Sequence, residues 1–237
     1  MKTKIIVVSI LLLLVAAFVF GCGKGLISPP LKSELGTPTI EKITFIHYEK
    51  SNSRSAPPWD YTEDDFRLIA GGVKWFDTTG YEVNPAGSVL VPEVVRSTLE
   101  TSLETWDSTT TSFELFDSPT LTDESSVGYD GTNRVVWGTL RPGVIAVTYL
   151  WYNAATKEIL ESDIVFNKYY TWSTTSVSDT MDLQNIATHE FGHNGLDDLR
   201  PPIDWALTMY AYSSLEETHK RTLGYGDILG IQELYGE

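Results

Sequence analysis

The sequence predicts a single α+β domain that follows an N-terminal export segment. Its 237 residues, 42% of them hydrophobic, are enough for one well-buried core. Apolar residues recur at helical spacing in three stretches. Segments rich in β-branched and aromatic residues, which favour strands, lie between the first and the second of these stretches. Helices and strands that are segregated along the chain in this way are typical of an α+β architecture.

Residues 1–22 have the layout of an export signal. Two lysines precede an apolar run that extends to Phe20, and Cys22, the only cysteine, follows it. The ending "VFGC" resembles the lipobox of prokaryotic lipoproteins, in which the cysteine carries the lipid. A lipid on Cys22, an ordinary cleaved signal and a retained anchor stay open as alternatives. We therefore expect an exported protein that is either anchored at the cell surface or secreted.

Residues 23–63 are rich in Ser, Pro and charged residues and contain one plausible strand, "IEKITFIHY". We interpret this segment as a tether between the membrane and a folded domain at 64–237. The formal net charge is −15, which supplies no clustered positive surface, so nucleic acid is excluded as an expected partner. We expect the domain to be a monomer.

The elements of the domain follow in order. Short strand-like pieces, "VKWF" and "YEVNP", precede a helix in which apolar residues recur from Val95 to Trp106. "NRVVWGTL", "GVIAVTYLWYN" and "EILESDIVFN" predict three strands, with "NAATKE" as the turn between the last two. A second helix is expected over "MDLQNIATHEFGH", with Ser178, Asp179 or Thr180 as its N-cap. "GDILGIQELYG" predicts a third helix.

The second helix carries the motif "HEFGH" at residues 189–193. Residues four apart lie on one helix face, so His189 and His193 can face one metal ion, with Glu190 beside them. Imidazole nitrogens suit zinc, and the carboxylate can take a proton from zinc-bound water. The alternative is a helix that carries surface histidines. We predict a catalytic zinc site with Glu190 as the general base.

The stretch "HEFGHNGLDDL" resembles the extended signature of the metzincin zinc proteases, H-E-x-x-H-x-x-G-x-x-H and its variant ending in Asp. "ALTMYAY" resembles their Met-turn, with Met209 as its methionine. "VPEVVRSTLETSLETW", "DIVFN" and "RTLGYGDILGIQELYG" are similar to matrixin elements in the same order, so the resemblance covers about residues 66–236. It implies a zincin-like fold, with a twisted mixed β-sheet, three main helices and a Met-turn after the active-site helix. It also implies a protein or peptide as the substrate.

The sequence departs from the family pattern directly after the motif. Only Asn194 stands between His193 and Gly195, where the family has two residues. Counted from the glycine, Asp198 falls where the family has its third zinc ligand; Asp197 and a weak site with two histidines are the alternatives. Asn and Gly readily adopt the left-handed conformation that ends helices, so we expect the backbone to adjust there.

The resemblance implies further roles. Tyr210 and Tyr212 are candidates for stabilising the oxyanion. The segment "VIAVTYLWY" is implied to be an edge strand to which an extended peptide adds by backbone pairing, with an ordinary core strand as the alternative. Calcium is a further candidate ligand for the acidic loop that contains Asp123, Glu124 and Asp130, although no ligand spacing marks a site.

The remaining histidines and the cysteine are expected to play no part in the site. His47 and His219 lie outside any ligand spacing and are expected at the surface. The chain has too few histidines for the additional structural zinc of matrixins. Family members are often kept latent by a propeptide cysteine, and none is available here because Cys22 belongs to the export segment.

The sequence thus predicts a zinc-dependent endopeptidase that hydrolyses peptide bonds in extracytoplasmic proteins or peptides. One alternative is a non-catalytic cell-surface pseudo-protease that binds peptides and whose third zinc ligand is impaired by the shortened turn after His193. Another is a β-rich adhesion domain in which the motif is accidental.

Overall fold

The computed structural model describes residues 39–50, 63–111, 113–200 and 205–237, which belong to one compact unit. The expected export segment with Cys22 lies outside these residues, as does most of the expected tether. Within the described part of the chain, no helix combines the length and the apolar character needed to cross a membrane.

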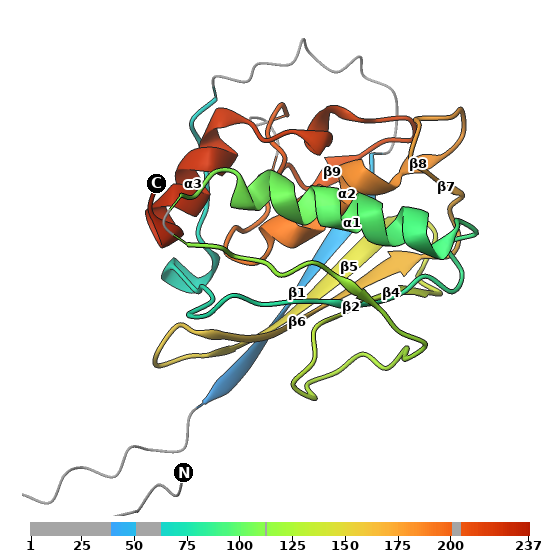
Figure 1. Ribbon diagram of the computed structural model, residues 1–237. Coiled ribbons are helices and arrows are strands. Elements are labelled where there is room, and N and C mark those ends of the chain that lie inside the picture. The colour runs from blue at the N-terminus through green and yellow to red at the C-terminus, as the bar shows by residue number, and fades with distance from the viewer. Residues whose placement is uncertain (1–38, 51–62, 112, 201–204) are drawn as a thin grey trace, which may run out of the picture. The chain divides into compact units, whose positions relative to one another are not determined.

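A seven-stranded mixed sheet, in the order β3-β2-β4-β6-β5-β1-β9, forms one layer of the domain (Figure 1). Neighbours from β3 to β6 are parallel, whereas β5 is antiparallel to both β6 and β1. The strands are β1 Ile40–Glu49, β2 Glu82–Asn84, β3 Thr120–Leu121, β4 Arg134–Gly138, β5 Val144–Asn153, β6 Ile159–Asn167 and β9 Tyr212–Ser213. A separate pair joins β7 Trp172–Ser173 to β8 Met181–Asp182.

The three strands predicted from the middle of the sequence are β4, β5 and β6, and the expected turn joins the last two. "VKWF" forms no strand, because Lys74 makes only an isolated bridge to Glu158. The strand expected inside the tether is β1, and it pairs with β5 along nearly its whole length. The expectation that β5 is an edge strand is therefore wrong, since β5 lies between β6 and β1.

Three α-helices form the other layer, as the resemblance implied (Figure 1). They are α1 Pro92–Asp107, α2 Leu183–Gly192 and α3 Tyr225–Tyr235, with short 3-10 helices at Ile69–Gly71 and His219–Arg221. The N-cap of α2 is Asp182, whose carboxylate accepts a hydrogen bond from the Asn185 amide. The expected caps at 178–180 are wrong because β8 intervenes, and its pairing with β7 delays the start of the helix.

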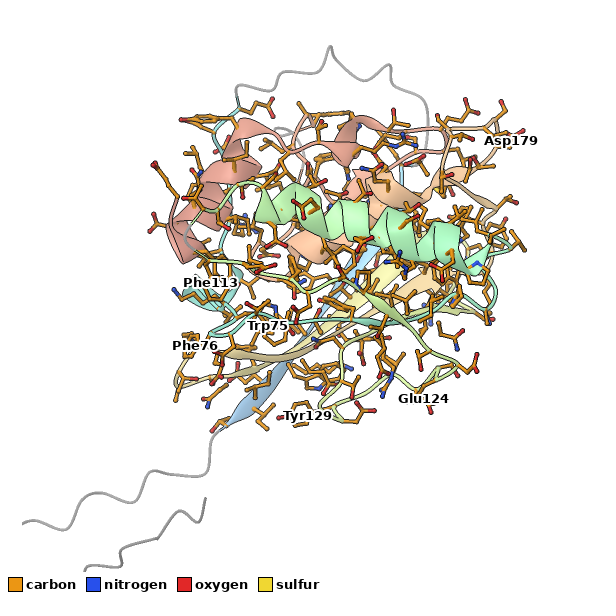
Figure 2. All side chains as sticks on the ribbon, in the orientation of Figure 1. Trp75, Phe76, Phe113, Glu124, Tyr129 and Asp179 are labelled. Atoms are coloured by element: carbon orange, nitrogen blue, oxygen red, sulfur yellow. The ribbon has the colours of Figure 1, made fainter. Side chains whose placement is uncertain are left out.

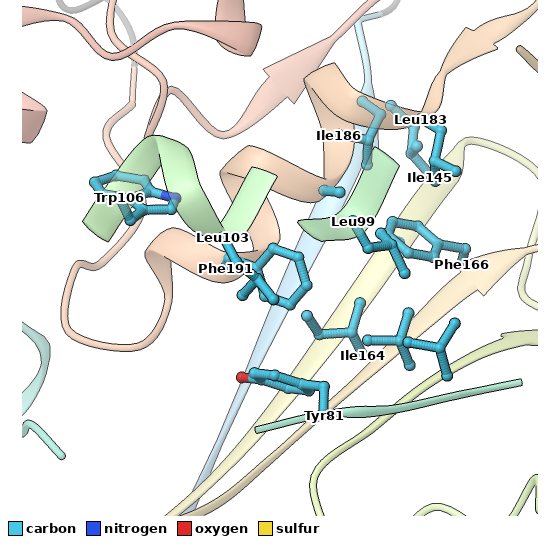
Figure 3. Packing of buried hydrophobic residues seen from close by; sticks show 14 of the residues in the cluster. Tyr81, Leu99, Leu103, Trp106, Ile145, Ile164, Phe166, Leu183, Ile186 and Phe191 are labelled. Atoms are coloured by element: carbon cyan, nitrogen blue, oxygen red, sulfur yellow. The ribbon is translucent and has the colours of Figure 1, made fainter. Parts of the chain in front are cut away.

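The main core lies between the sheet and the helices α1 and α2 (Figure 3). Leu99 of α1, Ile186 of α2 and Ile164 of β6 belong to one cluster of fully buried side chains. The indole Nε1 of Trp106 donates a hydrogen bond of 2.8 Å to the carbonyl of Thr188, which ties α1 to α2. This packing fixes the position of α2, the helix that carries the histidine motif.

Candidate active site

Three side chains from the last turn of α2 and the segment after it bring their ligand atoms within 4.8 Å of one another: His189, His193 and Asp198. The Oδ1 atom of Asp198 lies 3.5 Å from His189 Nε2 and 3.7 Å from His193 Nε2. All three atoms are buried and have no hydrogen-bond partner among the described residues. Buried polar atoms are normally paired, so three unpaired ones that face each other fit a bound cation. Donor atoms of a tetrahedral zinc site lie about 3.4 Å apart, close to these separations.

The other nitrogen of each imidazole faces a carbonyl. His189 Nδ1 donates to Thr208 O at 2.7 Å, and His193 Nδ1 donates to Leu196 O at 2.9 Å. A carbonyl oxygen can only accept, so the Nδ1 atoms carry the protons and the Nε2 atoms keep their lone pairs. These second contacts orient both rings towards Asp198.

The charge states of the three groups also suit a divalent metal. Burial lowers the pKa of His189 and lowers that of His193 to about 4, so both rings are neutral at pH 7. Burial alone would raise the pKa of Asp198, but the two histidines and Arg200 outweigh it and hold the pKa below its usual value. Two neutral imidazoles and one carboxylate are a donor set that zinc accepts in enzymes.

The shortened turn is closed by a tighter helical geometry. The His193 amide donates to Glu190 O at 3.2 Å and the Asn194 amide to Phe191 O at 3.1 Å, both of them i to i+3 bonds. Such a turn holds 3.0 instead of 3.6 residues, so the chain rotates further per residue and makes up for the missing one. Neither Asn194 nor Gly195 has a positive φ, so the expected left-handed adjustment is wrong.

Asn194 holds this turn in place through its side chain, which is buried. Its Oδ1 atom accepts hydrogen bonds from Trp75 Nε1 at 2.8 Å and from the Tyr81 hydroxyl at 3.0 Å. Its Nδ2 atom donates to Phe191 O at 2.9 Å. Asp197, the alternative ligand, is not part of the group that Asp198 forms with the histidines.

The turn around Met209 lies against the end of α2, where the resemblance implies it. A Cβ atom at Gly192 would come within 2.2 Å of Met209 Sδ, so only glycine fits between the helix and this turn. The carboxylate of Asp227 in α3 accepts hydrogen bonds from the amides of Thr208 at 2.7 Å, Met209 at 3.1 Å and Gly224 at 2.8 Å. No sequence pattern marked Asp227, which anchors the turn to α3.

Glu190 lies beside the donor group and is fully buried. Its Oε2 atom accepts a hydrogen bond of 2.6 Å from the Thr148 hydroxyl of β5, and its Oε1 atom shares one of 2.9 Å with His47 Nδ1. Burial raises the pKa of Glu190 to about 8, although the Thr148 hydrogen bond and the charge of Lys220 act in the opposite direction. A carboxyl group that titrates near neutral pH can both accept and return a proton.

His47 enters the site from β1, and the expectation that it lies at the surface is wrong. Its exposed fraction is 1%, and its ring centroid lies 4.0 Å from that of His189. Its Nε2 atom is 3.0 Å from the Ser213 hydroxyl oxygen. His219 is buried too, so its expected surface position is also wrong. No local signal marks His47, because the strand pairing of β1 with β5 brings it here from 142 residues before His189.

Lys220 is a further buried residue that no sequence pattern marked. Its Nζ atom donates to the carbonyls of Tyr210 and, at 3.1 Å, Tyr212, and lies 3.4 Å from His47 Nε2. Burial lowers its pKa to about 8. The lysine thus ties the segment after Met209 to His47.

The two candidate oxyanion residues follow the Met209 turn. Tyr210 is buried and stacks on Trp205 with 5.6 Å between ring centroids. The ring of Tyr212 lies 5.6 Å from that of Tyr210 and 6.4 Å from that of Tyr48 in β1. Their role in stabilising an oxyanion stays a prediction.

The acidic loop lies between β3 and β4, where Figure 2 labels Glu124. The carbonyls of Asp123 and Glu124 accept hydrogen bonds from Asn84, and the Asp130 carboxylate pairs with Arg134 at 2.6 Å. Two groups among the described residues could hold a metal ion, one of His189, His193 and Asp198 and one of His47, His189 and Glu190, and neither includes these acids. Calcium binding stays a prediction.

Comparison with known proteins agrees with this geometry. The family model for Matrixin, a peptidase family, matches residues 74–236, more than half of the chain. The match includes α2, the donor group and the Met209 turn, and it begins after β1. No curated protein matches the chain. The α+β fold and the zincin-like arrangement expected from the sequence are confirmed. The chain therefore belongs to the matrixin family and is a zinc metalloendopeptidase.

Proposed function

We propose that the chain hydrolyses peptide bonds in extended segments of extracytoplasmic proteins, with its zinc held by His189, His193 and Asp198. The observation that carries this proposal is the set of three buried donor atoms that face one another without hydrogen-bond partners. Each atom was desolvated on folding, and a cation at that point offsets the cost for all three.

We assign to Glu190 the role of general base. Zinc at this site would polarise the scissile carbonyl and make the attacking water more acidic. Glu190 would accept the proton of that water and deliver it to the leaving amine. Thr148 holds one carboxylate oxygen and so orients the other.

The peptide-binding alternative depended on the loss of the third ligand through the shortened turn. The turn is closed by i to i+3 hydrogen bonds, and Asp198 lies with both histidines. This geometry favours the enzyme over the pseudo-protease. The β-rich adhesion domain is not supported either, since the motif lies on a buried helix of a matrixin domain.

Glu190→Gln tests the assigned role. The substitution keeps the size of the side chain and its contact with Thr148 but removes the base, so peptide cleavage should fall by about a hundredfold or more while one zinc per chain is retained. Glu233→Gln, which changes an exposed glutamate of α3, is the matched control. Cleavage is measured by mass spectrometry of a peptide mixture, and zinc by metal analysis. Turnover that survives Glu190→Gln would refute the assigned role.

We also propose that the protein is exported and held at the membrane through Cys22. The support is the apolar run before this cysteine and the ending "VFGC". In cell fractionation, the wild type should partition with membranes and Cys22→Ser should not. Equal membrane association of both proteins would argue for a retained anchor, and absence of both from the membrane for a cleaved signal.

A further inference from the structure

The metal-ligand group is covered by two side chains of β1. The ring of Phe45 stacks on the ring of His193, with 3.9 Å between centroids and 10° between planes. The ring of His47 lies against the ring of His189, and its Nδ1 atom is hydrogen-bonded to one carboxylate oxygen of Glu190. As a result, His189 and Glu190 have no exposed surface. A peptide bond has no free path to these groups while β1 is in place.

β1 lies before the residues that match the matrixin model. It ends at Glu49, whereas the family match begins at residue 74. It pairs antiparallel with β5 at nine positions, from Ile40 to Tyr48. The only strand of the described sheet beyond β1 is β9, which pairs with the last two residues of β1. Without β1, the described sheet would therefore end at β5. β1 thus covers the sheet edge beside the candidate active site.

An extended peptide binds most readily by adding to an exposed sheet edge through backbone hydrogen bonds. The part of β5 that reaches Glu190 is Thr148, and the residue opposite Thr148 in β1 is Phe45. A peptide that paired with β5 and passed Glu190 would therefore occupy the space of Phe45, Ile46 and His47. A substrate peptide and β1 would therefore compete for the same position beside β5.

We infer that β1 is an internal occupant of the substrate site, so that the folded chain is latent and cleaves peptides only when β1 leaves β5. This inference rests on the proposed function. The occupant is held by side chains as well as by its backbone: Phe45 is buried in a cluster with Ile69, Val73 and Leu150. His47 is held by Ser213 and lies beside Lys220. The latency requires no cysteine.

A permanent β1 and a blocking β1 predict opposite changes in the cleavage rate when the side chains of β1 are removed. If β1 were a permanent strand and His47 oriented Glu190 for catalysis, removal of the imidazole would lower the rate. If β1 blocks the site, removal of the imidazole and of the ring of Phe45 raises the rate. The sign of the change therefore decides between the two.

The test compares the zinc-loaded full chain with Phe45→Ala/His47→Ala, the opened variant. Thr44→Ala is the matched control, since Thr44 lies in the same strand with its side chain exposed. Two rates are measured: cleavage of a quenched fluorescent peptide mixture, and removal of zinc by a chelator. We expect both rates to rise roughly tenfold or more in the opened variant, because the lost burial destabilises the closed state. Thr44→Ala should change neither.

A disulfide lock distinguishes departure of the strand from damage to the fold. Thr44 and Tyr149 lie directly opposite in the register of β1 and β5, where cysteines can be bridged. Thr44→Cys/Tyr149→Cys is added to the opened variant, together with Cys22→Ser to remove the native thiol. Oxidation should abolish the gain in both rates, and reduction should restore it. If the opened variant does not fold, the lock alone in the native background should slow both rates on oxidation.

The outcomes separate this inference from the proposed function. Unchanged or lower rates in a folded opened variant that binds zinc would overturn the latency. Faster zinc removal that the lock reverses, without any peptide cleavage, would support the covering role of β1 and count against the peptidase. Cleavage by the opened variant that Glu190→Gln abolishes would support both.

Discussion

At the scale of single residues, the geometry of the donor group depends on contacts made by atoms other than the three donor atoms. Asn194 fixes the tight turn by accepting hydrogen bonds from Trp75 and Tyr81. Backbone carbonyls hold the Nδ1 atoms of His189 and His193. Outer contacts of this kind determine the orientation of metal ligands and hence their affinity. With these contacts in place, the shortened turn brings Asp198 to 3.5 Å from His189 Nε2 and 3.7 Å from His193 Nε2.

Asp198→Asn and Asp197→Asn form a matched pair, because the two acids are adjacent and only Asp198 belongs to the donor group. Loss of the anionic ligand should weaken zinc binding by more than about a hundredfold, and the neighbouring change should leave it within about threefold. Competition with a coloured chelator gives both affinities. Equal losses would mean that neither acid is specifically a ligand, and a larger loss for Asp197→Asn would exchange their roles.

Only some of the residues in and around the donor group could be predicted from the sequence. His189, Glu190 and His193 could be predicted because their i, i+4 spacing is local to one helix. Asp198 could be predicted only as one of two acids, since the path of a turn depends on packing that a pattern does not contain. His47 and Lys220 could not be predicted, because strand pairing and burial, which are non-local, bring them to Glu190.

At the scale of elements, α2 is held in a narrow space between α1 and the Met209 turn. A Cβ atom on the last helical residue, Gly192, would meet both Met209 Sδ and the ring of Trp106. The Met209 turn is itself held by Asp227 of α3, which accepts hydrogen bonds from its backbone amides. The helices were predictable from apolar periodicity, but the start of α2 was not, because the pairing of β8 with β7 overrides the local caps.

Gly192→Ala should therefore destabilise the domain by about 1–3 kcal/mol, since the new Cβ atom would overlap Met209 Sδ and Trp106 Cζ2. Gly80→Ala is the control, because a Cβ atom there would lie 3.4 Å from Asp117 Cβ, an ordinary contact. Urea unfolding in the presence of a chelator measures both without a contribution from zinc. Similar urea concentrations at the unfolding midpoints of the two variants would show that the end of α2 can shift away from the Met209 turn at little cost.

At the scale of the whole molecule, the sheet order explains why the site is closed. The middle strands and their turn could be read from β-branched and aromatic runs. The position of β1 could not, since its sequence is equally compatible with a strand inside a tether. Because β1 joins the sheet beside β5, the same pairing that completes the sheet also places Phe45 and His47 against the rings of His193 and His189.

The central claim is that His189, His193 and Asp198 hold one zinc ion beneath β1. Anomalous diffraction at the zinc absorption edge from crystals of the zinc-loaded full chain tests it most directly. We predict one strong peak about 2.0–2.2 Å from Nε2 of both histidines and from a carboxylate oxygen of Asp198, with His47 and Phe45 over it. A peak held by other residues, or no peak at this position in zinc-saturated crystals, would contradict the account.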